Sequence, residues 1–161
     1  MAKQKEVKTN AMRILEGLKI PFEHHTYECE EFVDGIQIAD KLGLPHEKVY
    51  KTLLTVGASK NHFVFVIPIE AELDLKKAAK SVGEKSVEMI HVKEIQALTG
   101  YIRGGCTAIG MKKQFVTRVD EAAKELPKIV VSGGRLGSQI ELLPEDLLKA
   151  AKAEYADIIR R

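Results

Sequence analysis

Hydrophobic and polar residues follow two different periods along the chain, one typical of helices and the other of strands. Between Asn10 and Leu18, apolar residues recur at intervals of three and four, which predicts an amphipathic helix that Thr9 or Asn10 caps. By the same criteria, the predicted helices are Asn10–Leu18, Asp34–Leu42, Leu73–Val82, Val92–Leu98 and a final helix that begins at Pro144. In the second of these, Asp34 is the predicted N-cap and Gly43 the residue just past the end. The predicted strands are Phe22–Tyr27, Val49–Val56, His62–Ile69, Ser86–His91, Phe115–Val119, Lys128–Ser132 and Gln139–Leu143.

The strand predicted at His62–Ile69 is apolar on both faces, which places it in the centre of a sheet. Strands dominate the middle of the chain and helices flank them, without the regular alternation of a doubly wound fold. This order favours the α+β class, with a mixed and strongly curved sheet. No linker, internal repeat or low-complexity tract divides the sequence, so we expect a single domain over residues 1–161.

Composition narrows the function classes. Hydrophobic residues make up 45% of the chain and charged residues 30%, which is enough to bury a core. The formal net charge is only +2, so a nucleic acid would have to be bound by a local patch rather than by a global positive field. No apolar run is as long as a membrane span, and the charged first residues do not look like a signal peptide. We therefore expect a cytoplasmic protein without a membrane partner.

Histidine and cysteine positions do not favour a metal site. His24 and His25 are adjacent in a predicted strand, so their side chains should point to opposite faces and chelate poorly. The two cysteines, Cys29 and Cys106, form no CxxC pair, which disfavours a zinc site and a disulfide framework. We expect neither a metal nor another cofactor.

The segment from Gly100 to Gly110 has the composition of a ligand-binding loop, because four of its eleven residues are glycine. Glycine lets the backbone approach a ligand closely, and successive N–H groups in such a loop can form a nest for an anion or an oxyanion. The spacing matches neither the Walker A loop nor the dinucleotide-binding glycine pattern. An ordinary turn between two elements explains the same composition, so both interpretations stay open.

Two further positions carry candidate chemistry. Lys51 lies in the middle of a predicted strand, on the same face as Val49 and Leu53, where an unpaired charge is costly to bury. It indicates either a functional lysine or an edge strand whose lysine reaches solvent. The turn after Ser132 carries Arg135, and it fits either a functional site or an exposed hairpin turn.

Five stretches taken together resemble one known family. They are Lys8–Ala11, Tyr50–Leu53, Glu72–Lys77, Thr99–Tyr101 with Gly104–Gly105, and Ser132–Gly134. The set resembles the YbaK/EbsC family of aminoacyl-tRNA deacylases, and more narrowly the branch that clears Cys-tRNA(Pro). The resemblance covers nearly the whole chain in the expected order. It implies a mixed sheet curled into a partial barrel with flanking helices, a fold related to the editing domain of some prolyl-tRNA synthetases.

The resemblance also implies a site in which some residues act on the ester and others bind the substrate. The implied catalytic residues are Lys51, Gly104 and Gly105. The implied substrate-binding residues are Tyr27, Phe32, Thr52 and Ser132.

This sequence departs from the family pattern at two places. The family's loop usually continues after its two glycines with an apolar residue and Ser-Pro, whereas here Cys106–Ala108 follows. The late turn usually ends in Arg-Gly, whereas here Leu136 separates Arg135 from Gly137. The first departure removes a proline that would stiffen the loop, and the second weakens a role for Arg135.

For the chemistry, the resemblance implies an enzyme without a nucleophile of its own. The thiol of the substrate attacks its own carbonyl, the ribose hydroxyl leaves, and a cyclic thioester forms. The backbone of Gly104 and Gly105 would hold the oxyanion, while Lys51 would orient the ester oxygens and the terminal phosphate. Tyr27 and Phe32 would line the pocket or stack on the terminal adenine. The implied partners are the 3′ end of an aminoacylated tRNA and prolyl-tRNA synthetase.

Two other functions fit parts of the sequence. A conventional thiol hydrolase would use Cys106 as its nucleophile, but none of the five histidines shows a recognisable pairing with it. A non-catalytic protein that binds the tRNA end, or a regulator of the same fold, would bind charged tRNA without turning it over.

Overall fold

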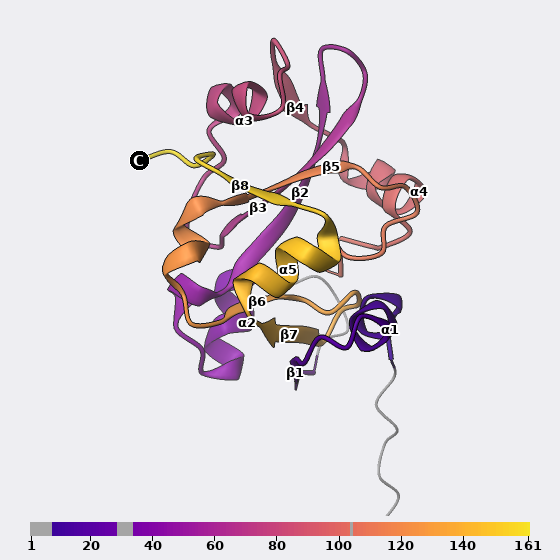
Figure 1. Cartoon of the computed structure of the whole chain (residues 1–161), viewed down its shortest axis with the longest axis vertical. Helices are drawn as coiled ribbons and strands as arrows, with labels where there is room; N and C mark the ends of the chain where they lie inside the picture. Colours follow the sequence, from indigo (N-terminus) through magenta and orange to yellow (C-terminus); the bar gives the residue numbers. More distant parts are fainter. Residues whose placement is uncertain (1–7, 29–33, 104) are drawn as a thin grey trace, which may run out of the picture.

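A computed structural model describes residues 8–28, 34–103 and 105–161 (Figure 1). All five predicted helices are present, within two residues of the expected starts, except that Val92–Leu98 is divided into a 3₁₀ turn and a short α-helix. The α-helices are α1 (Asn10–Gly17), α2 (Gly35–Leu42), α3 (Leu75–Ser81), α4 (Ile95–Thr99) and α5 (Pro144–Ala151). The 3₁₀ helices are η1 (His46–Lys48), η2 (Val92–Glu94) and η3 (Glu121–Glu125).

The ends of the helices follow from their capping residues. The Thr9 hydroxyl accepts a hydrogen bond from the Met12 N–H at 3.2 Å and so begins α1. The Asp34 carboxylate accepts one from the Gln37 N–H at 2.9 Å and begins α2, which ends where Gly43 adopts a positive φ of 67°. Pro144 occupies the first turn of α5, as predicted.

The strands form two sheets. The larger has the order β4-β2-β3-β5-β8, with β2 (Tyr50–Gly57), β3 (His62–Pro68), β4 (Val87–Met89), β5 (Val116–Asp120) and β8 (Glu154–Ala156). The smaller has the order β1-β7-β6, with β1 (Glu23–Thr26), β6 (Ile129–Ser132) and β7 (Ser138–Leu142). Each predicted strand corresponds to one of these, and β8, which pairs parallel with β5, was not predicted.

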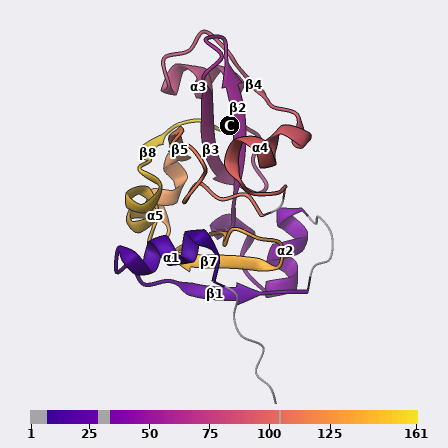
Figure 2. The same ribbon diagram turned by 90° about the vertical axis from the view of Figure 1, so that its right-hand side faces the viewer.

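The sequence predicted one curved sheet, and the structure differs by dividing it. The three-stranded sheet lies across one end of the five-stranded sheet (Figure 2). The two are joined where Val49, just before β2, forms a parallel bridge with Val130 of β6. The larger sheet is mixed, as expected, because β3 pairs antiparallel with β2 and parallel with β5. The molecule is therefore an α+β fold whose sheets do not close into a barrel.

The central position predicted for the His62–Ile69 strand is confirmed, because β3 is buried on both faces. Val64 and Val66 belong to the main core, which α1, α5, β6 and β7 also line. Phe63, Phe65 and Ile67 point to the other face, against α3. Apolar residues on both faces of β3 thus allow helices to pack on both sides of the larger sheet. In the described part of the chain, no helix has the length and apolar character needed to cross a membrane.

Among residues 8–28, 34–103 and 105–161, one stretch of β2 has a partner strand on one side only. The Gly57 N–H donates to the Asn61 carbonyl and the Ile69 N–H donates to the Val49 carbonyl, so odd-numbered residues of β2 direct their main-chain groups toward β3. Even-numbered residues therefore direct theirs toward the opposite edge. On that edge β6 approaches at Val49, while β4 pairs from Thr55 onward and the Ile90 N–H after it donates to the Leu54 carbonyl at 3.4 Å. The main-chain N–H and C=O of Thr52 face the gap between them.

Candidate functional site

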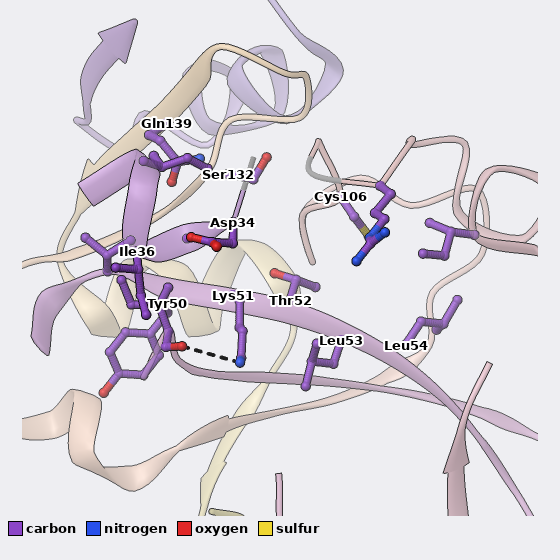
Figure 3. Close-up of a pocket in the computed structure, with 16 residues that line it drawn as sticks. Asp34, Ile36, Tyr50, Lys51, Thr52, Leu53, Leu54, Cys106, Ser132 and Gln139 are labelled. Carbon is purple, nitrogen blue, oxygen red and sulfur yellow. Dashed lines mark hydrogen bonds between the residues drawn. The ribbon is translucent and has the colours of Figure 1, made fainter. Parts of the chain in front are cut away.

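A pocket of about 430 Å³ occupies this gap beside β2 (Figure 3). Its floor is formed by residues 49–54 on both faces of the strand, and its walls come from four other parts of the chain. The wall residues include Asp34, Ile36 and Ile38 from the start of α2, Ile69 after β3, Ile95, Arg103 and Cys106 around the glycine-rich segment, and Ser132 and Gln139 from the β6–β7 hairpin. Most of this surface is apolar, and a few polar groups converge on it, which is typical of a small-ligand site.

Lys51 lines this pocket and does not simply extend into solvent. Strand β3 flanks one side of β2 along its length, whereas β6 and β4 reach the other side only at its two ends, so Lys51 lies at the stretch between them. The half-buried Lys51 Nζ donates a hydrogen bond to the Ile69 carbonyl at 3.4 Å. Burial lowers the pKa of Lys51 below its usual range, and the carboxylates of Glu72 and Asp34 act in the opposite direction. The lysine is therefore held half-buried at a cavity of ligand size.

Three of the residues that the resemblance implied are brought together in the pocket: Lys51, Thr52 and Ser132. The first two are neighbours on β2, and Ser132 ends β6 and accepts a hydrogen bond from the Gly134 N–H at 3.2 Å. Tyr27 follows β1, where its N–H donates to the Gly137 carbonyl at 3.0 Å, and it does not line the described pocket wall. Phe32 and Gly104 lie outside the described residues.

Gly105 is next to the pocket residue Cys106, and its own N–H donates to the Ile102 carbonyl at 2.9 Å. Only a glycine fits here, because a Cβ atom at this position would lie 2.8 Å from the Arg135 Cα atom. The need for glycine at 105 therefore comes from the close approach of the β6–β7 turn, which the sequence did not reveal.

We expect Gly105→Ala to destabilise the protein by about 1–3 kcal/mol, because the added methyl group must push two segments of backbone apart. Thermal unfolding measures the effect. Gly17→Ala is a matched control, since a Cβ at the end of α1 would meet no described atom within 4 Å. Equal melting temperatures for Gly105→Ala and the wild type would contradict the tight packing of the loop against the turn.

The sequence analysis did not assign Asp34 or Gln139 to the site. Asp34 was recognised only as a helix cap. Gln139 is the direct partner of Ser132 in the β6–β7 register, so the predicted hairpin contained the signal that places it beside the serine. Cys106 was considered only as the nucleophile of a rival mechanism.

The histidines point to opposite faces of β1, as predicted. The His24 ring is hydrogen-bonded to the Ser138 hydroxyl, and the His25 ring to the Glu141 carboxylate, both at 2.8 Å. Glu23, His25 and Glu141 could offer ligand atoms within 4.8 Å of one another. However, the Lys48 ammonium also contacts Glu141, and the Lys128 ammonium lies 3.7 Å from Glu23. These carboxylates are already neutralised, which disfavours a cation between them.

Comparison with known proteins identifies the family. The model of the aminoacyl-tRNA editing domain matches residues 30–150 of this chain. The chain belongs to the aminoacyl-tRNA editing domain family. This confirms the resemblance drawn from the five sequence stretches.

Individual relatives agree with this assignment. Over 160 residues, the editing domain is 47% identical to a protein of Enterococcus faecalis named "Putative Cys-tRNA(Pro)/Cys-tRNA(Cys) deacylase EbsC", with 98% of each chain covered. It is 26% identical over 111 residues to "Uncharacterized protein YwhH" of Bacillus subtilis, covering 69% of this chain and 70% of the relative.

Solved structures support the fold of the editing domain. The crystal structure of "hypothetical protein APE2540" has a TM-score of 0.82 and 22% identity, covering 92% of this chain and 97% of that one. A second, of a "putative trans-editing enzyme for prolyl tRNA synthetase", has a TM-score of 0.78 and 21% identity, covering 95% and 99%. At these identities the likeness is one of fold.

Proposed function

We propose that this chain is a trans-editing deacylase, a single editing domain that removes cysteine from Cys-tRNA(Pro) and from Cys-tRNA(Cys) in the cytoplasm. Two findings support the proposal. The relative of 47% identity carries that activity in its name, and the pocket gathers Lys51, Thr52 and Ser132 around a cavity suited to a small acyl group. The pocket is the observation that carries the proposal, because Lys51 lines a cavity whose size suits a small ester.

The need for such an enzyme has a physical origin. A pocket that accepts proline cannot strongly reject cysteine by size, since small apolar differences are worth only about 1–3 kcal/mol. A second site that hydrolyses or rearranges the wrong product is the general remedy.

In the proposed mechanism the substrate supplies the nucleophile. The sulfur of the cysteinyl group attacks its own carbonyl carbon, and the bond from that carbon to the ribose oxygen breaks. The thiol proton ends on the ribose hydroxyl, and the amino acid leaves as a cyclic thioester. The protein has to hold the ester in the reactive conformation and stabilise the developing oxyanion.

Each residue of the site has a proposed role in this reaction. Lys51 orients the ester oxygens and the terminal phosphate as a point charge, and Thr52 and Ser132 bind the substrate. Gly104 and Gly105 supply backbone N–H groups for the oxyanion. For Gly105, this role requires that its N–H be shared with, or released from, the Ile102 carbonyl. Tyr27 and Phe32 complete the set by lining the pocket or stacking on the terminal adenine.

The rival mechanism uses Cys106, which does line the pocket. Burial raises the pKa of this thiol to about 11, so it is protonated at neutral pH and a poor nucleophile. None of the described pocket-lining residues is a histidine that could act as its base.

We therefore expect Cys106→Ser to retain deacylation within a few-fold of the wild type, because the residue contributes only to the pocket wall. Single-turnover release of cysteine from Cys-tRNA(Pro) measures this. A complete loss of activity in a variant that melts normally would favour the thiol hydrolase instead.

The selection of the mischarged tRNA requires a further component. With a net charge of +2, the chain has little basic surface for reading a tRNA body. We propose that prolyl-tRNA synthetase delivers Cys-tRNA(Pro). A panel of mischarged tRNAs, assayed with and without the synthetase, tests the activity and the partner together. Binding of charged tRNA without turnover of any member would favour the non-catalytic alternative.

A further inference from the structure

Asp34 occupies a position that its role as a helix cap does not fully explain. One carboxylate oxygen, Oδ1, accepts the Gln37 N–H at 2.9 Å and begins α2. The residue also lines the pocket together with Lys51, and Figure 3 shows it across the β2 ribbon from the lysine ammonium. An N-cap needs one acceptor oxygen, whereas a carboxylate has two oxygens and a full negative charge.

The charged groups of the pocket are of both signs, with the Lys51 ammonium and the Arg103 guanidinium as its described cations. Among the described residues that line it, Asp34 carries the one carboxylate, and Lys51 lies nearby on β2. The carboxylates of Glu72 and Asp34 both favour the charged form of the half-buried lysine, against the lowering of its pKa by burial. A ligand that fits this arrangement has a positive group and a negative or electron-rich group only a few bonds apart.

The aminoacyl ester has this charge pattern. Its α-ammonium is attached to the carbon next to the ester carbonyl, so the cationic nitrogen and the acceptor oxygen are separated by three bonds. Because a charged hydrogen bond to a carboxylate is among the stronger polar contacts in proteins, such a pair would fix the orientation of the carbonyl as well as bind it.

We propose that the Asp34 carboxylate binds the α-ammonium group of the aminoacyl ester while Lys51 faces its oxygens. This assignment rests on the proposed deacylase function and deepens it. Asp34 is then a substrate-binding residue that selects for a free α-amino group, and it turns the carbonyl of the substrate toward the cation on β2.

The chain offers a variant that separates this role from helix capping. Asparagine caps helices about as well as aspartate but carries no charge, so Asp34→Asn should keep α2 and lose the ammonium contact. Asp74→Asn is a matched control, because Asp74 caps α3 through the Lys76 and Lys77 N–H groups and does not line the pocket. Both variants lose the same charge at the same type of position.

The test compares two substrates on the wild type and both variants, at about pH 6.5, where an α-amino group is protonated. One substrate is Cys-tRNA(Pro), and the other carries the same thiol with a hydroxyl in place of the α-amino group. We expect Asp34→Asn to lower kcat/KM for Cys-tRNA(Pro) by about 10- to 100-fold, as for the loss of a charged hydrogen bond, and to leave the hydroxy ester unchanged. Asp74→Asn should leave both rates unchanged, and all three proteins should melt alike.

The outcomes separate this assignment from the proposed function. If the wild type cleaves Cys-tRNA(Pro) but Asp34→Asn slows both substrates equally, or neither, the role of Asp34 is overturned and the deacylase function stands. If the wild type leaves both esters intact, the deacylase function is overturned and this assignment with it.

Discussion

Lys51→Ala is expected to slow deacylation of Cys-tRNA(Pro) by about 10²- to 10³-fold, the loss typical of removing one group that stabilises developing negative charge. The lysine is held half-buried in the pocket by β2, with its Nζ at the Ile69 carbonyl. The fold should survive the change, because deleting a charge whose pKa is already lowered by burial relieves a desolvation cost. Single-turnover rates and thermal melting of the same preparations measure the two effects.

Two further variants sharpen this result. Lys51→Met keeps the length of the side chain and should be nearly as slow as Lys51→Ala, which shows that the charge rather than the bulk matters. Lys76→Ala removes a cation from the exposed face of α3 and should retain the wild-type rate. Near wild-type turnover by Lys51→Ala would remove this lysine from the site.

A second large difference is expected between the rates at which the wild-type protein cleaves two substrates. Cys-tRNA(Pro) should be cleaved more than about a hundredfold faster than Ser-tRNA(Pro), which exceeds what a pocket achieves between nearly isosteric side chains. The reason is that a few per cent of the substrate's thiol is ionised at neutral pH, whereas a hydroxyl is not, and only the thiolate is a strong nucleophile.

The comparison is made with saturating enzyme, so that binding differences do not enter the rate. Cys-tRNA(Cys) serves as the control for the tRNA body, and it should react as fast as Cys-tRNA(Pro) when the synthetase is absent. Similar rates on the seryl and cysteinyl esters would mean that water, and not the substrate, attacks the carbonyl. The substrate-assisted mechanism would then be wrong, although the protein would still be a deacylase.

The predictable part of the fold is the part that local chemistry specifies. Capping side chains at Thr9 and Asp34, the proline that opens α5, and the double-sided apolar pattern of β3 act within a few residues, and each was confirmed. The elements that were missed depend on distant partners. Strand β8 has only three residues and exists because β5 offers it a parallel edge, which no local pattern indicates.

In the candidate site, too, local sequence predicted some features, and contacts between distant segments determined the others. Alternation along β2 identified Lys51 as an unusual cation, but alternation alone did not distinguish a pocket from a solvent-exposed edge. That difference arises from how the two sheets meet: Val130 of β6 reaches β2 at Val49 and then diverges. The close packing of Gly105 on Arg135 is likewise a contact between two loops. From composition alone, a ligand was one explanation for a glycine at 105, whereas in the structure the nearby Arg135 backbone requires it.

The gap in the pairing of β2 has a consequence for inhibition. A small molecule with an amide donor and acceptor spaced as in an extended peptide can pair with the main chain of Thr52, in the manner of a peptide that adds to a sheet edge. Because those hydrogen bonds go to the backbone, no replacement of the Thr52 side chain deletes the groups that make them, apart from proline, which lacks the N–H. Resistance to such a compound would have to arise among the residues that line the pocket, which include Lys51 and Ser132, the residues proposed to bind the substrate.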